Sequence, residues 1–326
     1  MSGATSRLGA RPGTSNSSST GPDAEERLHQ VLTRLDRVVV AFSGGADSAF
    51  LAWSATQVLG RDRVLCATAV SPSLASSERQ ACEDLARTWG LRWQAVATAE
   101  MDDPRYRANG LDRCFRCKSA LMEAFAPLAS AEEATVVLGV NVDDLGDHRP
   151  GQRAAAEAGA MFPLVEAGFD KALVRSASRR AGLVTWDKPA APCLASRLPY
   201  GTPVTIGTLR SVGAAEAGLR ALGFGDVRVR HYGDLARVEV PAGDLPRCLE
   251  QRQDVVAAVR GAGYRYVTVD LEGLRPGNLN AAAGVNPPSD TPSDVTVRAV
   301  PVRTGYGAGP AASGSDTGRA TRGETR

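Results

Sequence analysis

A β-branched run that ends in two adjacent glycines constrains this chain more than any other stretch. Residues 38–42 read Val-Val-Val-Ala-Phe, and Ser-Gly-Gly-Ala-Asp-Ser follows at 43–48, before an apolar helical pattern. This order predicts a buried strand, a tight turn and a helix that begins at the turn. Paired glycines let backbone N–H groups approach an anion, which the positive end of a helix also favours. We therefore predict a phosphate site formed by Ser43, Gly44, Gly45, Asp47 and Ser48.

Three further apolar runs indicate the fold class. They lie at 64–70, 91–97 and 135–138, and helical patterns alternate with them. Strands that alternate with helices form βαβ units, so we expect an α/β fold with a parallel sheet and helices on both faces. Such sheets bind ligands at the carboxyl ends of their strands, where the glycine turn would lie.

The pattern changes after residue 205 and predicts a small α+β unit. A helix at 206–222 precedes two alternating runs at 226–231 and 235–240, which we interpret as a hairpin. A helix at 244–260 and a strand at 264–271 complete the unit. The predicted organisation is a disordered tail, a nucleotide-binding domain, a C-terminal α+β domain and a second disordered tail, at 1–23, 24–188, 189–275 and 276–326.

Composition limits the classes of partner. Lysine and arginine total 38 and aspartate and glutamate 36, so net charge gives no argument for a nucleic-acid partner. No apolar run approaches the roughly 18 residues that a membrane span needs. Six cysteines without a secretory signal indicate a reducing compartment. We expect a cytoplasmic protein that binds neither membrane nor nucleic acid.

Three of the six cysteines lie in polar surroundings. Cys114 and Cys117 form a Cys-x-x-Cys pair at the junction between a loop and a helix predicted from Cys117 to about residue 126, which is compatible with a redox pair, half a zinc site or iron–sulfur ligands. Cys193 lies in a proline-rich loop at 187–201, four residues before Arg197. A nearby guanidinium stabilises a thiolate, so Cys193 is a candidate nucleophile or metal ligand. Cys66 and Cys82 fall in a predicted strand and helix, and we assign them to packing.

Two further polar stretches are candidate ligand contacts. The segment 139–151 follows a strand end and is rich in carboxylates; Asp144 and Asp147 could support magnesium and Arg149 a phosphate, although a solvated turn has the same composition. Arg228 and Arg230 lie two apart and share one strand face. They could bind a phosphate or a carboxylate, or that face could simply be exposed.

These motifs together resemble a known family. Ser-Gly-Gly-x-Asp-Ser is similar to the phosphate loop of the PP-loop ATP pyrophosphatase superfamily, and the motifs taken together resemble the LarE family of sulfurtransferases. That family acts in the biosynthesis of the nickel-pincer cofactor of lactate racemase. The resemblance covers about residues 25–275, and its motifs occur in the family's order at 43–48, 113–118, 139–151, 192–201 and 228–234.

The resemblance implies a specific reaction. ATP and Mg²⁺ would adenylate a carboxylate of pyridinium-3,5-biscarboxylic acid mononucleotide, and a sulfur nucleophile would then displace AMP. Cys193 would be the catalytic cysteine, and the presence of Cys114 and Cys117 matches members thought to bind a 4Fe–4S cluster through three thiolates. The implied phosphate contacts are Arg197, Arg228 and Arg230. The implied partners are other proteins of nickel-pincer cofactor biosynthesis and further copies of the chain in a homo-oligomer.

Three alternatives remain at this stage. A tRNA thiolase of the same superfamily would need an extended basic surface, which a net charge of +2 does not favour. An amide synthetase would give the cysteines no role. A non-catalytic nucleotide or iron–sulfur sensor would bind ATP without releasing pyrophosphate.

Overall fold

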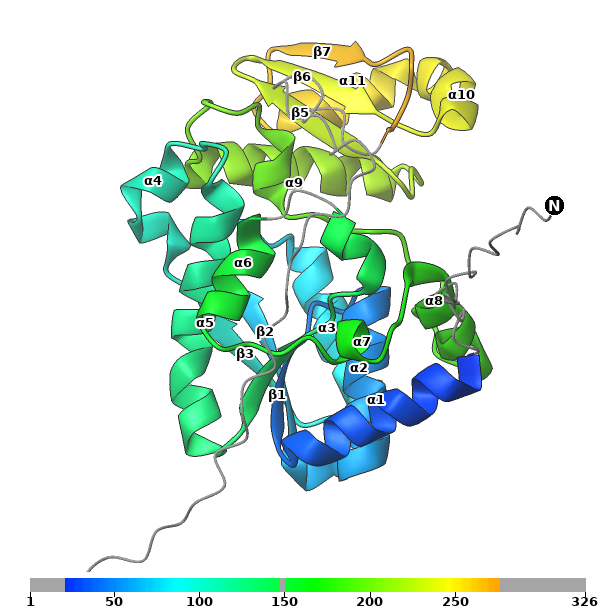
Figure 1. Cartoon of the computed structure of the whole chain (residues 1–326). Helices are drawn as coiled ribbons and strands as arrows, with labels where there is room; N and C mark the ends of the chain where they lie inside the picture. Colours follow the sequence, from blue (N-terminus) through cyan, green and yellow to red (C-terminus); the bar gives the residue numbers. More distant parts are fainter. Residues whose placement is uncertain (1–20, 147–149, 276–326) are drawn as a thin grey trace, which may run out of the picture. The chain divides into compact units, whose positions relative to one another are not determined.

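The computed structural model describes residues 21–146 and 150–275 (Figure 1). The predicted tails at 1–23 and 276–326 lie almost entirely outside these residues. The candidate ligands Asp147 and Arg149 also lie outside them.

The four apolar runs form one parallel sheet in the order β3-β2-β1-β4. Its strands are β1 Val38–Ala41, β2 Val64–Val70, β3 Trp93–Ala97 and β4 Thr135–Leu138. Val39 of β1 is in register with Leu65 on one side and Val136 on the other. The glycine turn that follows β1 is therefore placed between two neighbouring strand ends, and the predicted parallel sheet is confirmed.

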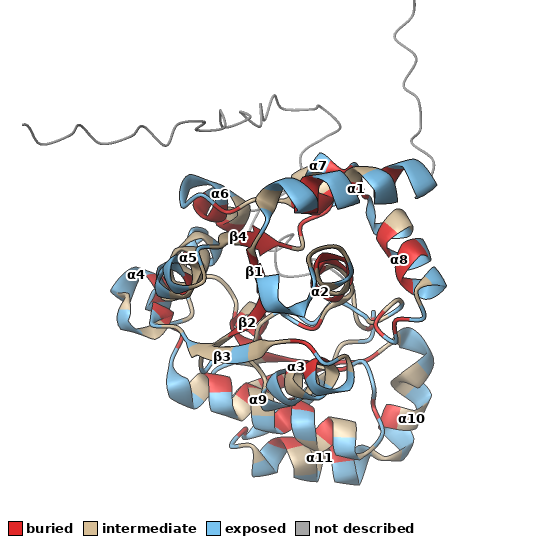
Figure 2. Cartoon of the chain, turned by 90° about the horizontal axis from the view of Figure 1, so that it is seen from below, coloured by how far each residue is buried: buried red, intermediate tan, exposed pale blue. Residues whose placement is uncertain are grey.

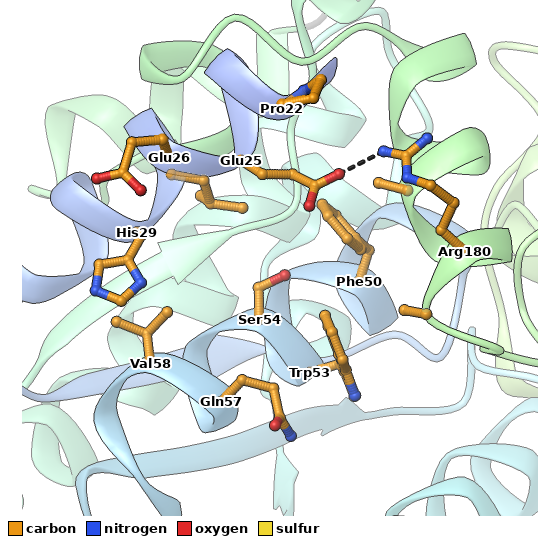
Figure 3. A pocket seen from close by; sticks show the side chains of 13 residues that line it. Pro22, Glu25, Glu26, His29, Phe50, Trp53, Ser54, Gln57, Val58 and Arg180 are labelled. Atoms are coloured by element: carbon orange, nitrogen blue, oxygen red, sulfur yellow. Dashed lines mark hydrogen bonds and ion pairs between the residues drawn. The ribbon is translucent and has the colours of Figure 1, made fainter.

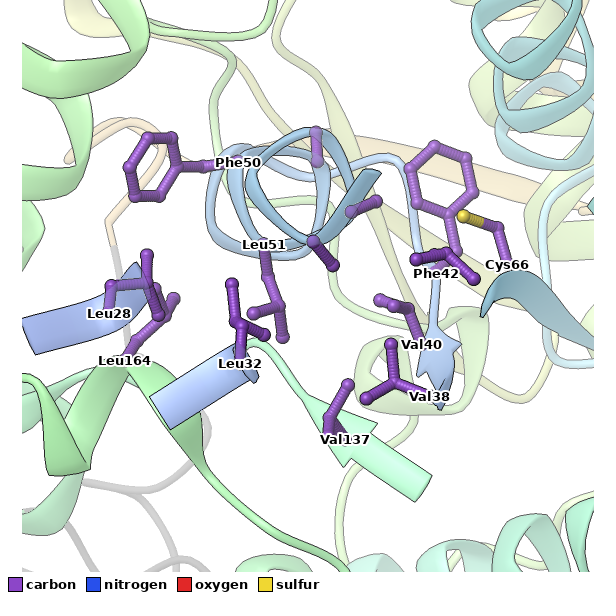
Figure 4. Close-up of a cluster of buried hydrophobic side chains, with 14 of the residues drawn as sticks. Leu28, Leu32, Val38, Val40, Phe42, Phe50, Leu51, Cys66, Val137 and Leu164 are labelled. Atoms are coloured by element: carbon purple, nitrogen blue, oxygen red, sulfur yellow. The ribbon is translucent and has the colours of Figure 1, made fainter. Parts of the chain in front are cut away.

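Helices cover both faces of this sheet because successive strand residues point to opposite sides (Figure 2). Val38 and Val40 pack with Leu28, Leu32 and Leu51, which Figure 4 shows as one cluster. The helices on this side include α1 Gly21–Leu35, α2 Ala46–Leu59, α3 Ser76–Thr88, α7 Pro163–Glu166 and α8 Lys171–Arg180. On the other side Val39 packs against residues of α5 Arg113–Ala131 and α6 Pro150–Glu157.

The C-terminal part has a three-stranded sheet in the order β5-β6-β7 and a core of its own. The predicted hairpin is confirmed, because β5 and β6 are antiparallel, and β7 then pairs with β6 in parallel. The elements are α9 Ile206–Ala221, β5 Arg228–Tyr232, β6 Leu235–Glu239, α10 Leu245–Glu250, α11 Arg252–Gly261 and β7 Tyr266–Val269. The single helix expected at 244–260 is wrong, because the chain leaves helical geometry at Gln251 (φ −90°, ψ 21°).

The two cores are not divided cleanly along the sequence. Tyr106, in the short helix α4 Pro104–Arg107, packs into the core of the C-terminal sheet. All described residues belong to one compact unit, so the boundary at 188/189 stays a prediction. The described residues also include five 3₁₀ turns: η1 Arg61–Arg63, η2 Glu100–Asp102, η3 Val142–Gly146, η4 Leu194–Arg197 and η5 Ala242–Asp244.

One element begins earlier than the sequence suggests. Helix α5 starts at Arg113 instead of Cys117, so both Cys114 and Cys117 lie inside its first two turns. Arg113 is buried and donates to Asn109 Oδ1 at 2.7 Å and to the Ala195 carbonyl at 2.8 Å. The bond to Ala195 joins residues 82 apart, so no local sequence signal indicates it. Across residues 21–146 and 150–275, every helix is too short or too polar to cross a membrane.

Candidate active site

The glycine turn has the geometry of an anion site. Gly44 adopts φ 67°, a backbone conformation that residues with a side chain rarely adopt. A Cβ at this position would also lie only 2.9 Å from Cys82 Sγ, so both the backbone and the packing favour glycine. The hydroxyls of Ser43 and Ser48 lie 3.0 Å apart and close the turn. Gly45 is the N-cap of α2 and no side chain caps the helix. The first N–H groups of α2 therefore remain available to a phosphate oxygen.

Two carboxylates flank this turn. Asn141, three residues after β4, donates from Nδ2 to Asp47 Oδ1 at 3.1 Å, and its backbone N–H donates to Asp144 Oδ2 at 3.3 Å. Burial raises the pKa of Asp47, and the nearby charge of Asp144 raises it further. Lys171 Nζ lies 3.3 Å from Asp144 Oδ1. Two carboxylates that both accept hydrogen bonds from Asn141 offer oxygen ligands of the kind that Mg²⁺ prefers, beside the phosphate turn.

Close packing holds β4 against the start of α2. A Cβ on Gly139 would lie 2.7 Å from the Ser48 backbone nitrogen and 2.8 Å from its Cα. Only glycine lets the end of β4 pass this close to the first turn of α2. This contact sets the position of the phosphate turn relative to Asn141 and Asp144.

A cavity of about 200 Å³ opens beside the turn. Its lining includes Ser43 and Ser48 from the turn, Lys118 and Phe125 from α5, and Gly139. A larger cavity of about 630 Å³ lies between α1, α2 and α8, where Glu25 and Arg180 form an ion pair (Figure 3). None of the site residues predicted from the sequence lines the larger cavity, so the smaller one marks the candidate site.

The loop that carries Cys193 is anchored at the same sheet edge. The Leu194 backbone N–H donates to the carbonyl of Ser73, which follows β2, at 2.8 Å. Lys188, five residues before Cys193, donates from Nζ to the Gly44 carbonyl at 3.2 Å and to Glu78 Oε2 at 2.9 Å. The extended, non-helical path predicted for 187–201 is wrong at the 3₁₀ turn η4, which directly follows Cys193, and at the turns that end the stretch on either side. The structure therefore bonds the cysteine loop to the phosphate turn.

The three candidate metal ligands, Cys114, Cys117 and Cys193, lie near one another, but their side chains are not close enough together to bind one metal ion. Burial raises the pKa of Cys117 to about 12, and the charge of Cys193 contributes. Although burial disfavours its charge, Arg113 has a raised pKa because Cys193 and Cys114 lie close by. Among the described residues no three His, Cys, Asp or Glu side chains stand close enough to hold a metal ion. Three thiols suit an iron–sulfur cluster in kind and number, but they would have to approach one another to bind it.

The three predicted phosphate-binding arginines have different surroundings. Arg197 and Arg230 are buried and paired with Glu216 and Glu239, with N–O distances of 2.8 Å in both pairs. Arg230 also donates to the Ser196 carbonyl at 2.9 Å. Arg228 is half-buried, and its side chain makes no hydrogen bond or ion pair with another residue of the described chain. Burial lowers its pKa, and the charges of Arg197 and Arg230 lower it further.

Sequence reasoning gave no role to several residues that build this site. They are Arg113, Asn141, Lys188, Glu216 and Glu239. Arg113 and Asn141 lie inside motifs that carried the family resemblance, so proximity to those motifs was an available signal. Lys188 is one of only three lysines in the chain, which was a second signal. The two glutamates form bonds that depend on the tertiary fold, and no local pattern indicates them.

Comparison with known proteins gives relatives over most of the chain. The chain is 44% identical over 258 residues to the uncharacterized protein slr1717 of Synechocystis, covering 78% of this chain and 96% of that protein. It is 38% identical over 254 residues to the pyridinium-3,5-bisthiocarboxylic acid mononucleotide synthase of Lactiplantibacillus plantarum, covering 78% and 92%. The chain belongs to the LarE family. A third relative, the uncharacterized protein MJ0830 of Methanocaldococcus jannaschii, is 24% identical over 237 residues, covering 72% and 90%. No family model matches the chain.

In this LarE-family protein the residues of the sequence motifs converge in space. The phosphate turn, Asp144 and the Cys193 loop lie at one edge of the parallel sheet. Arg197 and Arg230 are bonded to the backbone of the same loop, at the Cys193 and Ser196 carbonyls. Cys114, in contrast, is exposed on the first turn of α5.

Proposed function

We propose that this protein is an ATP-dependent sulfurtransferase that acts on pyridinium-3,5-biscarboxylic acid mononucleotide. The relative from Lactiplantibacillus plantarum is named as the synthase of the corresponding bisthiocarboxylic acid, and the two chains align over most of their lengths. In such a synthesis, sulfur must replace a carboxylate oxygen. A carboxylate is a poor acceptor for a sulfur nucleophile, so activation by ATP is the chemistry that the site has to supply.

The phosphate turn and the two aspartates would bind Mg²⁺ and ATP. The free N–H groups at the start of α2 are suited to bind phosphate oxygens. Asp47 and Asp144 are suited to bind a Mg²⁺ ion that also contacts the phosphates. The apolar wall of the 200 Å³ cavity, which includes Phe125, would contact the organic part of a bound nucleotide.

Activation and transfer are two displacements. A substrate carboxylate oxygen attacks the α-phosphorus, and the bond to the oxygen bridging the α- and β-phosphates breaks, so pyrophosphate leaves. A sulfur nucleophile then attacks the activated carbonyl carbon, and AMP leaves with the electron pair of the carbon–oxygen bond. Arg228, whose guanidinium makes no hydrogen bond or ion pair within the described chain, is suited to the phosphate of the mononucleotide. The product would pass to other proteins of nickel-pincer cofactor biosynthesis.

Cys114, Cys117 and Cys193 would hold a 4Fe–4S cluster. With three protein ligands, the cluster would supply an iron with an open coordination position that can carry the sulfide to be transferred. The half-buried Cys117 must lose its proton on binding iron, which its raised pKa opposes and the positive charge of the metal favours. The chain's own contribution is to keep Cys193 in a loop that Arg113 and Arg197 hold by hydrogen bonds.

One observation carries the proposal: the loop that contains Cys193 is bonded to the sheet edge that contains the phosphate turn. The bond from Leu194 N to the Ser73 carbonyl joins that loop to the end of β2, which neighbours β1. A thiol loop and a phosphate site that share one edge can act on the same substrate carboxylate.

The test is anaerobic purification followed by iron and sulfide analysis. We expect iron in the wild-type protein and its loss in Cys114→Ala, while Cys248→Ala, at a buried cysteine of the C-terminal core, should retain it. Incubation with ATP, Mg²⁺ and substrate should release pyrophosphate. ATP binding without pyrophosphate release would instead indicate a sensor.

Mass spectrometry after turnover separates two routes for the sulfur. If the cluster route operates, Cys193 keeps its sulfur. Loss of the elements of H₂S from Cys193 would show that the cysteine gives up its own sulfur and would contradict the cluster.

A further inference from the structure

Lysine is rare in this chain, and all three lysines lie at the candidate site. The chain has 38 lysine and arginine residues, of which only Lys118, Lys171 and Lys188 are lysine. Lys118 lines the cavity beside the phosphate turn, Lys171 pairs with Asp144, and Lys188 bonds to the turn itself. An ammonium group is a compact point charge, whereas a guanidinium is a wide planar fork. The presence of all three lysines at one site indicates that compact cations are required there.

Lys188 has the most specific position of the three. Its Nζ lies 3.2 Å from the Gly44 carbonyl oxygen and 2.9 Å from Glu78 Oε2. Gly44 is a residue of the phosphate turn, so the ammonium lies at the rim of the anion site. Its side chain and that of Glu78 are 25% and 26% exposed, so a ligand can reach both. A partly exposed ion pair of this kind contributes little free energy and can be exchanged for another anion.

Lys188 also holds one end of the cysteine loop. Residues 189–192 are exposed, and this segment runs from Lys188 to Cys193. The next anchor is the bond from Leu194 N to the Ser73 carbonyl. The position of the Lys188 side chain therefore affects the path of the segment that precedes Cys193.

We infer that Lys188 binds the pyrophosphate part of ATP and exchanges for this purpose between Glu78 and the β- and γ-phosphates. The inference rests on the proposed function and extends it to the leaving group. When the bond between the α-phosphorus and the bridging oxygen breaks, its electron pair stays with the pyrophosphate. An ammonium at the rim of the turn neutralises that added charge without any proton transfer. Departure of pyrophosphate returns Lys188 to Glu78 and so links product release to the anchor of the Cys193 loop.

The test measures binding of magnesium pyrophosphate by calorimetry to four forms of the whole chain. Lys188→Gln should bind about tenfold more weakly, the effect of losing one charge-assisted hydrogen bond. Glu78→Gln should bind more tightly, because the competing carboxylate is gone. The double variant should match Lys188→Gln, because Glu78 acts only through the lysine.

Other outcomes separate the possibilities. If Glu78→Gln also tightens binding in the Lys188→Gln background, the carboxylate acts by direct repulsion and exchange is refuted. A purely structural pair predicts that both single variants weaken binding. Arg87→Gln, which removes one cation from the same helix as Glu78, should leave binding unchanged. Thermal unfolding checks that each variant folds; if Lys188→Gln does not fold, unchanged or weaker binding by Glu78→Gln overturns the inference.

The same experiment distinguishes this inference from the proposed function. If the wild-type protein binds no magnesium pyrophosphate, the ATP-pyrophosphatase chemistry itself is refuted. If the wild type and Lys188→Gln bind it equally, the proposed function stands and only the role of Lys188 fails.

Discussion

Arg197 and Glu216 form a buried, bidentate ion pair next to the loop that contains Cys193. Arg197 Nε donates to Glu216 Oε1 at 2.8 Å and Nη2 donates to Oε2 at 3.1 Å, and the two side chains are 5% and 0% exposed. Arg197 Nη1 also donates to the Pro192 carbonyl at 2.6 Å and the Cys193 carbonyl at 3.3 Å. Because Glu216 lies in α9, this pair connects the Cys193 loop to the core of the C-terminal sheet.

The first prediction is that Glu216→Gln strongly destabilises the fold. Removing one partner of a buried pair leaves the other charge uncompensated, which costs about 3–5 kcal/mol. Urea unfolding measures the loss. The matched control is Arg220→Met, because Arg220 bonds the same carboxylate but is 35% exposed, and it should cost less than about 1 kcal/mol. Equal costs for the two variants would contradict a supporting role for the Arg197–Glu216 pair.

The second prediction separates Arg228 from its neighbours. Its pKa is lowered by burial and by two nearby arginines, so Arg228→Gln should leave the free energy of unfolding unchanged or raise it. Binding of a pyridine mononucleotide should weaken by roughly 10- to 100-fold, because one charge-assisted phosphate contact is lost. Arg230→Gln should instead destabilise the protein, since it leaves Glu239 without this buried partner. Calorimetric titration and urea unfolding of both variants check the contrast; a destabilised Arg228→Gln with intact ligand affinity would refute it.

The third prediction concerns Gly139. A methyl group there would meet the Ser48 backbone nitrogen at 2.7 Å, so Gly139→Ala must push the start of α2 away from β4. Overpacking of this kind typically costs about 1–3 kcal/mol, and the displaced turn should lose ATP affinity. Gly225→Ala is the control, because no atom lies within 4 Å of its added Cβ. ATP affinity that survives in Gly139→Ala would show that the contact does not position the turn.

The strands that position the site were predictable because their signal is local. The runs at 64–70 and 135–138 have the same bounds in the sequence prediction and in the structure. Buried parallel strands are continuous apolar segments, and their ends mark where ligands bind. The pair Gly44–Gly45 then identified the phosphate turn, and the structure requires glycine at Gly44, which has a positive φ and packs closely on Cys82.

The pairing of the charged residues could not be predicted from the sequence. Strand periodicity placed Arg228 and Arg230 on one face, but only the fold shows that Arg230 is neutralised by Glu239 and Arg228 is not. Arg197 and Glu216 are 19 residues apart and meet only when α9 packs under the loop. The beginning of α5 likewise depends on Arg113, which bonds to a carbonyl 82 residues away. Such contacts depend on tertiary structure, whereas sequence patterns report local periodicity.

The last prediction is a pH dependence that Asp47 gives to stability. The pKa of Asp47 is raised in the folded state, chiefly by burial, while the hydrogen bond from Asn141 opposes the shift. The folded state therefore keeps this proton at pH values where the unfolded chain, with a pKa of about 3.9, has lost it. The contribution of Asp47 to stability is thus present at low pH and is lost as the pH rises through the folded-state pKa.

Replacing the carboxylate should consequently separate stability from ligand binding. Without ligand at pH 7, Asp47→Asn should unfold at the same temperature as the wild type or higher, because no buried charge has to be maintained. Magnesium and ATP should stabilise the wild type, since a cation between Asp47 and Asp144 offsets both charges, but should stabilise the variant little. Thermal unfolding from pH 4 to 7, with and without magnesium and ATP, measures both effects, with the exposed Asp84→Asn as control. A variant that is less stable without ligand yet still responds fully to magnesium and ATP would show that Asp47 supports the fold and does not bind the cation.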